Sequence, residues 1–283
     1  MQRIFLFNGI FVALNFSIKV DHAGKDDAIR AVVAIGSSTR TELKADEYSD
    51  LDLFIVTTDP DRWYSGEYPG IIGNVSIAFI EPTLGGGKEY RCIYEEDLDV
   101  DMIVLSPEQM EDAAKEGVLE WVMNRGYSVL YDAQNYAELL SKYVTHGQAR
   151  PEMPENEFKN IVNDFFFHNI WAYKKLKRGE LWSAKMCVDA YLKQRLLRMI
   201  EFYCYKVEGR DVWHDGRFID RWADDWILND IKKCFAHYES EDVKSALDAT
   251  HLLFEKVTRR IAEAEGYTYP ERAKDCAYAF LKS

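Results

Sequence analysis

The chain has 283 residues, of which 47% are hydrophobic and 14% aromatic, so it is long enough for two ordinary domains that each bury a core. Its charged fraction of 29%, without long biased runs, excludes a largely disordered chain. The formal net charge of -13 weighs against broad nucleic-acid binding, because an acidic surface repels phosphate backbones. The same charge is compatible with a cationic substrate, or simply with solubility.

The N-terminus and the cysteines bear on localisation. Residues 4–16 are nearly all apolar and resemble the middle of a signal peptide, but they are too short to span a membrane and lack a following cleavage site. The competing interpretation is a core helix or strand of the first domain. The five cysteines are odd in number and form no Cys-x-x-Cys pair, so neither a disulfide framework nor a cysteine metal site is expected. Reduced cysteines favour a cytoplasmic protein.

Short apolar runs that stop at turn residues predict strands in the first half of the chain. The predicted strands cover residues 30–35, 51–58, 75–81, 89–95, 98–105 and 127–131. Acidic turn residues between the fourth and fifth of these predict a β-hairpin. Ser106, followed by Pro107 and by Gln109 at the third position, is typical of a helix start with a capping box.

The composition changes over residues 147–158, where two prolines, a glycine and few apolar residues predict a linker. Beyond it, apolar residues recur every three to four positions, which indicates helices that each bury one face. Four such stripes run over residues 158–173, 181–203, 219–238 and 243–261. The sequence therefore predicts an α/β domain over residues 1–147 and an all-α helical bundle over residues 153–283.

The most informative segment is the strand that begins at Asp50. Asp50 and Asp52 alternate with Leu51 and Leu53, so both carboxylates point to one side and both leucines to the other. Such a pair is common on solvated strand edges, but this strand is otherwise apolar, and two unneutralised carboxylates there are costly. Divalent cations such as Mg²⁺ take oxygen ligands of this kind and bridge to substrate phosphates.

Two further elements strengthen this interpretation. Gly36 and Ser37 end the preceding strand, where a glycine lets the backbone approach a phosphate and a serine hydroxyl can bind its oxygens. A third carboxylate is expected on a neighbouring strand, and we choose Asp101, with Asp99 in reserve, because an apolar strand core follows Asp101 directly. Together these residues favour a metal-dependent phosphoryl or nucleotidyl transfer site over a structural acidic edge.

This set resembles the signature of the DNA polymerase beta-type nucleotidyltransferases, and in detail that of the aminoglycoside 6-adenylyltransferases (streptomycin adenylyltransferases). The resemblance covers most of the chain from about residue 31 to residue 270, and in the second half it rests on residues 163–166, 177–181, 195–200 and 266–270. It implies a nucleotidyltransferase catalytic domain of α/β (α+β) type with a mixed sheet, followed by a helical substrate-binding domain. The apolar N-terminal run and residues 63–87 depart from the family pattern, which leaves the acceptor open.

The resemblance also implies roles for individual residues. Asp50, Asp52 and Asp101 would be catalytic and would bind Mg²⁺, and Asp101 would also be the general base. Contacts to the phosphates of ATP would come from Gly36, Ser37, Arg40, Lys177, Arg178 and Lys185. Several of these residues also have a purely structural interpretation, in which Ser37 caps a turn, Arg40 is solvated in its loop, and Lys185 covers an apolar stripe with its aliphatic part.

The implied reaction is Mg-dependent transfer of AMP from ATP to a hydroxyl of an aminoglycoside such as streptomycin, which gives antibiotic resistance. Glu180 and Asp189 are candidates for binding the cationic acceptor, and no nucleic-acid or membrane partner is expected of this monomer or small homo-oligomer. One alternative keeps the chemistry and changes the acceptor to another small molecule or a protein hydroxyl. Another is a non-catalytic nucleotide-binding or antitoxin-like module, which is disfavoured because the carboxylate set is intact.

Overall fold

The computed structural model of the chain describes residues 27–40, 42–83, 87–95, 98–144 and 152–282. The apolar run at residues 4–16 and the first five residues of the predicted linker, 147–151, lie outside these described residues, and the last four linker residues, 155–158, already belong to a helix. The chain divides into two compact units, Met1–Ala149 and Arg150–Ser283. Each unit is described by itself.

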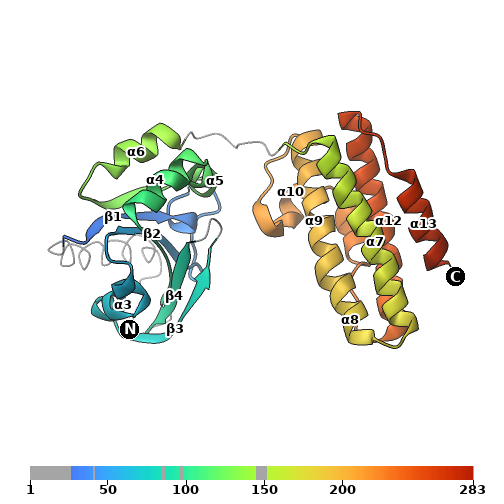
Figure 1. Ribbon diagram of the computed structural model, residues 1–283, viewed down its shortest axis with the longest axis horizontal. Coiled ribbons are helices and arrows are strands. Elements are labelled where there is room, and N and C mark those ends of the chain that lie inside the picture. The colour runs from blue at the N-terminus through green and yellow to red at the C-terminus, as the bar shows by residue number, and fades with distance from the viewer. Residues whose placement is uncertain (1–26, 41, 84–86, 96–97, 145–151, 283) are drawn as a thin grey trace. The chain divides into compact units, whose positions relative to one another are not determined.

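The first unit is built on a six-stranded sheet with the order β3-β4-β5-β2-β1-β6 (Figure 1). Its strands are β1 Ile29–Ile35, β2 Leu51–Thr57, β3 Val75–Pro82, β4 Lys88–Tyr94, β5 Leu98–Leu105 and β6 Ser128–Asp132. β2 and β5 pair in parallel and all other neighbours are antiparallel, which confirms the expected mixed sheet. β4 and β5 form the predicted hairpin, and the last strand returns to the edge beside β1.

Both faces of this sheet carry apolar clusters, and the alternation along β2 assigns each side chain to one of them. Leu51 and Leu53 belong to the cluster that includes Trp63 and Tyr68 from α2 Asp61–Tyr64 and α3 Glu67–Ile72. Phe54 packs in the opposite cluster, which is covered by α4 Pro107–Lys115, α5 Val118–Met123 and α6 Tyr136–Tyr143. Burying one such side chain contributes about 1.5–3 kcal/mol, which fixes the register of β2 and hence the side to which Asp52 points.

The start of α4 has the predicted capping box. The Ser106 hydroxyl accepts a hydrogen bond from the backbone N–H of Gln109, and the Gln109 side chain accepts one from the backbone N–H of Ser106. These two bonds satisfy amide groups that otherwise lack partners in the first turn of a helix. The helix therefore begins directly after β5 and lies over the sheet.

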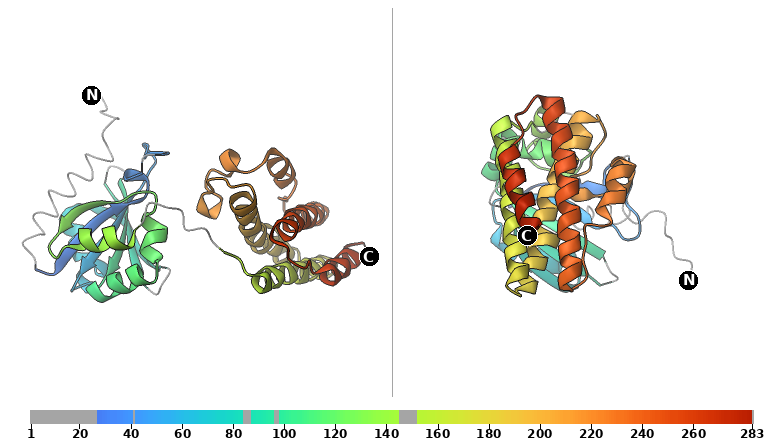
Figure 2. Two further views of the ribbon diagram at one scale, coloured as in Figure 1. Left: turned by 90° about the horizontal axis from the view of Figure 1, so that it is seen from above. Right: turned by 90° about the vertical axis from the view of Figure 1, so that its right-hand side faces the viewer.

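The second unit is a bundle of helices, seen nearly end-on in the left view of Figure 2. Phe165 and Phe254 stack in its core with ring centroids 3.5 Å apart. Its long elements are α7 Glu155–Lys177, a continuous helical stretch of α8 Leu181–Met186, η2 Cys187–Tyr191, α9 Leu192–Phe202 and η3 Tyr203–Val207, then α12 Ser240–Glu265 and α13 Glu271–Leu281. The helices predicted from the first, second and fourth apolar stripes are thus confirmed. The structure adds α13, which the sequence analysis did not predict.

The prediction of a single helix over residues 219–238 is wrong. Two short helices, α10 Ile219–Trp222 and α11 Asp225–Ile231, replace it, because Asp224 between them is extended with φ -68° and ψ 147°. The Asp224 carboxylate accepts hydrogen bonds from the Arg210 guanidinium and the Trp226 indole. These tertiary contacts stabilise the break, and a three-to-four periodicity contains no information about them.

All five cysteines are free, and Cys276 alone among them is exposed. Burial raises the pKa of Cys187 to about 12 and that of Cys92 to about 11, so neither thiol is activated at neutral pH. Within the described part of the chain, every helix is too short or too polar to cross a membrane.

Candidate active site

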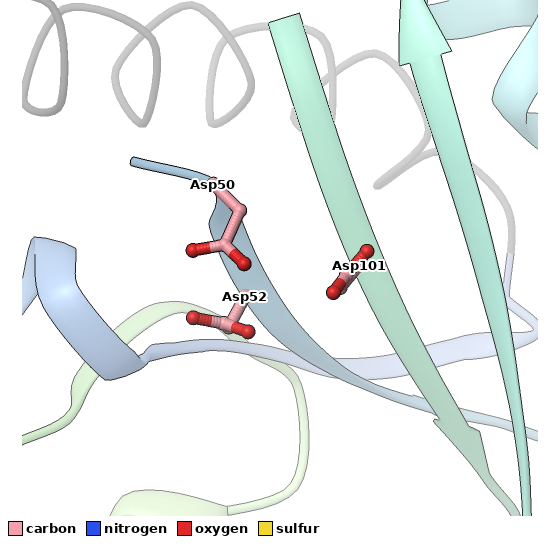
Figure 3. A group of neighbouring side chains, drawn as sticks. All are labelled: Asp50, Asp52 and Asp101. Atoms are coloured by element: carbon pink, nitrogen blue, oxygen red, sulfur yellow. The ribbon is translucent and has the colours of Figure 1, made fainter. Parts of the chain in front are cut away.

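Three carboxylates meet where β2 and β5 run side by side. Asp52 and Asp101 are register partners in this parallel pair, and Asp50 directly precedes β2 (Figure 3). Each of the three offers an oxygen atom that lies within 4.8 Å of the others. Because partners in register point to the same face of a sheet, the side chains predicted on separate strands converge.

Asp101 is the most enclosed member of this carboxylate cluster, with a relative exposure of 3%. Its Oδ2 atom accepts a hydrogen bond from the Arg91 guanidinium, while Oδ1 has no hydrogen-bond partner among the described residues. A buried anionic oxygen without a partner is costly, and a divalent cation would satisfy it. The donor set therefore fits a hard, oxygen-preferring cation.

The alternative third carboxylate, Asp99, lies two residues earlier, at the exposed start of β5. Its register partner on β4 is Ile93, whereas that of Asp101 is Arg91. Burial, and then the negative charge of Asp101, raise the pKa of the Asp99 carboxyl. The structure brings Asp101 into the compact set with the β2 pair, as the sequence analysis chose.

The Gly-Ser turn lies directly against this cluster. Gly36 begins a short 3-10 turn, Gly36–Ser38, with a positive φ of 68°, and a Cβ atom built on it would lie 2.0 Å from Oδ2 of Asp52. The buried Ser37 hydroxyl donates to the backbone carbonyl of Asp50 at 3.5 Å. Glycine is therefore required by both the left-handed backbone and the close approach of the carboxylate.

The other predicted phosphate-binding cations lie in different surroundings. Arg40 follows the Gly-Ser turn and donates from Nε to the Leu43 carbonyl at 2.6 Å. Lys177 and Arg178, together with Lys174, line a hollow of about 450 Å³ in the second unit. Three cations around one hollow form a surface that favours an anion.

Lys185 is engaged in the second unit. Its ammonium group donates to Asp189 and to the backbone carbonyl of Ala236. Glu180, the other proposed acceptor-binding carboxylate, pairs with Lys175 and with Arg178. The structure thus pairs both acidic candidates with cations of their own unit.

A second hollow in this unit, of about 550 Å³, is rich in aromatic side chains. It is lined by His168, Trp171, Trp182, Ser183, Met186, Cys187 and Tyr191. The Asp164 carboxylate accepts hydrogen bonds from the Tyr191 hydroxyl and from Arg195 beside it. These bonds hold the Tyr191 ring in the wall of this aromatic hollow.

Sequence reasoning missed Arg91, which lies opposite both Asp101 on β5 and Phe79 on β3. The hydrogen bond from Arg91 to Asp101 is the main cause of the raised pKa of this arginine. Glu89 lies two residues earlier on the same strand, and burial, followed by the charge of Asp101, raises its pKa. The signal was available, since polar and apolar residues alternate along β4 and place both side chains on the face of the cluster.

A mixed sheet followed by a helical unit, with a Gly-Ser turn beside carboxylates on neighbouring strands, defines an enzyme of the nucleotidyltransferase class. Within that class, the family model for streptomycin adenylyltransferase matches residues 16–283, and the chain belongs to this family. The match includes the cluster, the Gly-Ser turn and the helical unit.

Curated relatives carry the name aminoglycoside 6-adenylyltransferase. The chain is 21% identical over 270 residues to that of Bacillus subtilis (strain 168), covering 90% of this chain and 91% of the relative. It is 21% identical over 264 residues to that of Staphylococcus aureus, covering 87% and 89%. A crystal structure of an aminoglycoside 6-adenyltransferase from Bacillus subtilis aligns over 95% of this chain and 97% of that chain, with 18% identity and a TM-score of 0.46.

Proposed function

We propose that this protein transfers AMP from ATP to a hydroxyl group of an aminoglycoside and releases pyrophosphate. The observation that carries the proposal is the convergence of Asp50, Asp52 and Asp101 within 4.8 Å, in a chain of the streptomycin adenylyltransferase family. The names of its curated relatives support the same reaction. A bacterium with this activity would resist the antibiotic that it modifies.

The carboxylate cluster would hold Mg²⁺. Asp50 and Asp52 would provide ligands from β2, and Asp101 would provide its unpartnered Oδ1 from β5. Bound there, Mg²⁺ would neutralise charge on the phosphates of ATP and on the attacking oxygen. The buried setting of Asp101 strengthens this electrostatic contribution, because surrounding apolar residues exclude water.

The Gly-Ser turn would receive the triphosphate. Gly36 has no side chain to obstruct a phosphate, and the Ser37 hydroxyl lies beside the backbone of Asp50. Arg40 would reach the phosphates from the following loop, and Lys177 and Arg178 would add positive charge from the second unit. Lys185 would make such a contact only after it releases Asp189.

The acceptor would be held by the second unit, in the aromatic hollow that contains Trp182 and Tyr191. Aromatic faces bind both sugar rings and cations, and an aminoglycoside presents both. The net charge of -13 favours a cationic molecule over an anionic one. We therefore put streptomycin first among the acceptors to be tested.

The acceptor hydroxyl loses a proton as its oxygen attacks the α-phosphorus and the bond to pyrophosphate breaks. Asp101 is our candidate for accepting this proton, because it is the most enclosed carboxylate of the cluster. Asp50 and Asp52 would keep their charges and hold the ATP end of the site. This division of roles follows from burial, because Asp101 is buried whereas Asp50 and Asp52 are half-buried.

One incubation tests the proposal: purified protein, Mg-ATP and a panel of aminoglycosides, analysed by mass spectrometry and by release of pyrophosphate. We expect one panel member to gain the mass of one AMP. Transfer of AMP to a different small molecule or to a protein side chain would support the same reaction with a different acceptor. Binding of ATP without release of pyrophosphate, across a wide range of acceptors, would contradict the proposed reaction.

A further inference from the structure

Arg91 makes two charged contacts on the face of the sheet that carries the cluster. Its guanidinium donates to Oδ2 of Asp101 on one side and to Oε1 of Glu81, at 3.4 Å, on the other. The guanidinium carbon also lies 6.0 Å from the centre of the Phe79 ring. Neighbours on both adjacent strands therefore fix this guanidinium beside the most enclosed carboxylate of the site.

This placement has two opposite electrostatic effects. With a relative exposure of 3%, Asp101 would be a buried, unpaired charge if Arg91 were absent and no cation were bound, which is strongly destabilising. The same positive charge repels any metal ion that binds at Oδ1, the other oxygen of the same carboxylate. Arg91 therefore favours the cation-free site and disfavours the cation-bound one.

We propose that Arg91 is a built-in counter-ion that stabilises the carboxylate cluster in the absence of metal and weakens its affinity for a divalent cation. Tight binding of a divalent cation would then depend on the additional negative charge of the nucleotide phosphates. Arg91 acts through Asp101 and is a positioning residue. The inference rests on the metal site of the proposed function and is independent of the acceptor.

The test uses the full chain and Mn²⁺ as the probe, without nucleotide. Arg91→Met removes the charge, and Arg91→Gln removes the charge but keeps a hydrogen-bond donor. Arg62→Met is the matched control, because Arg62 in the same unit pairs with Glu67 and lies 4.2 Å from the centre of the Tyr68 ring. Mn²⁺ affinity is measured by electron paramagnetic resonance, and thermal unfolding is followed in EDTA and in excess Mn²⁺.

We expect both Arg91 variants to bind Mn²⁺ at least about tenfold more tightly than the original protein, since a unit charge beside a divalent ion contributes at least this much. Both should unfold at a lower temperature in EDTA and recover most of the loss in Mn²⁺. Arg91→Lys, which keeps the charge, should stay near the original affinity, and Arg62→Met should leave it unchanged. A purely structural role for Arg91 would not tighten metal binding.

Unchanged or weaker Mn²⁺ binding in both Arg91→Met and Arg91→Gln would overturn the inference. Weaker binding would mean that Arg91 orients Asp101 as a ligand, and unchanged binding would mean that the charge of Arg91 does not influence the affinity of the cluster for a cation. If no form of the protein binds Mn²⁺, even with a non-hydrolysable ATP analogue, the metal site of the proposed function falls together with this inference. If the variants show the expected changes in Mn²⁺ affinity but the protein adenylylates no acceptor, the proposed function is contradicted and this inference is retained.

Discussion

Gly36 and Asp52 approach so closely that a methyl group on the glycine would lie 2.0 Å from a carboxylate oxygen of the aspartate. Gly36→Ala must therefore displace the Asp52 side chain, and it also puts alanine at a φ of 68°. We expect adenylylation to fall by at least about a hundredfold, because the displaced ligand leaves the geometry that the site needs. Pyrophosphate release with saturating Mg-ATP measures the loss.

The control for this variant is Gly117→Ala. Gly117 has a φ of 77°, similar to that of Gly36, but a Cβ atom built on it meets nothing within 4 Å. Both variants should lose about 1–2 kcal/mol of stability from the left-handed backbone. Only Gly36→Ala should lose activity, and equal activity in the two variants would show that contact with Asp52 has no functional consequence.

The carboxylate cluster itself is tested by Asp50→Asn, Asp52→Asn and Asp101→Asn. Each change removes a charge from the proposed metal ligands while nearly preserving side-chain volume, so we expect turnover to fall by at least about a thousandfold with the fold retained. Circular dichroism and thermal unfolding check the fold, and formation of AMP-modified acceptor measures turnover. Near-normal turnover in the two β2 variants would reject the assigned roles.

Asp112→Asn is the matched control for charge. Asp112 is in the same unit, on α4, and its side chain is 71% exposed. Losing a surface carboxylate changes the net charge as much as losing Asp50 does. Activity should stay close to that of the original protein, which separates the local effect of the cluster from a general effect of charge.

Much of the first unit follows from the sequence because its strands are short apolar runs bounded by turn residues. The same alternation that buries Leu51 and Leu53 fixes the direction of Asp52. The cluster could therefore be predicted from the two-residue periodicity of this strand and one carboxylate on a neighbouring strand. The choice of Asp101 over Asp99 also followed from its apolar continuation. Local pattern thus determined which side chains converge.

The parts that could not be predicted depend on contacts between distant residues. The extended residue Asp224, whose carboxylate accepts a hydrogen bond from Arg210 on the preceding segment, interrupts a helix that periodicity alone predicts as continuous. The Lys185 ammonium likewise donates to the backbone carbonyl of Ala236, which lies 51 positions later in the chain. Such pairings depend on tertiary packing, which a single sequence does not encode in its spacing.

The aromatic hollow of the second unit yields a prediction about the acceptor. Trp182 lines it with 68% of its surface exposed, and its ring lies 6.2 Å from that of Tyr238, centre to centre. We expect Trp182→Ala to raise KM for the aminoglycoside by about tenfold, the loss of one aromatic contact, and to leave KM for ATP unchanged. Steady-state kinetics with each substrate varied in turn would show the difference.

Leu252→Ala serves as the control for Trp182→Ala. Leu252 lies on α12, is 58% exposed and lines neither of the two hollows described here. Its truncation should leave both KM values unchanged. If Trp182→Ala changes KM for ATP rather than KM for the aminoglycoside, the aromatic hollow belongs to the nucleotide and the acceptor must bind elsewhere.

Lys193 makes the stability of the second unit depend on pH. Its ammonium donates to the Val188 carbonyl at 2.9 Å and to the Thr250 hydroxyl at 2.8 Å, and burial lowers its pKa from 10.5 to about 8. Between these two values the unfolded chain keeps a proton that the folded chain has released. The contribution of Lys193 to the free energy of unfolding therefore rises with pH above about 8, by about 3 kcal/mol at 1.36 kcal/mol per pH unit, whereas the buried thiols of this unit, whose pKa values burial raises, contribute in the opposite direction.

Urea unfolding between pH 7.5 and 9.5 measures this slope, below the range where ordinary tyrosines titrate. Lys193→Met should lower the slope relative to the original protein, because the methionine binds no proton in either state and the rising contribution of Lys193 is lost. Lys233→Met, which removes a lysine with 68% of its side chain exposed, should keep the original slope. If Lys193→Met and the original protein show the same slope, the burial of Lys193 does not contribute to the response to pH.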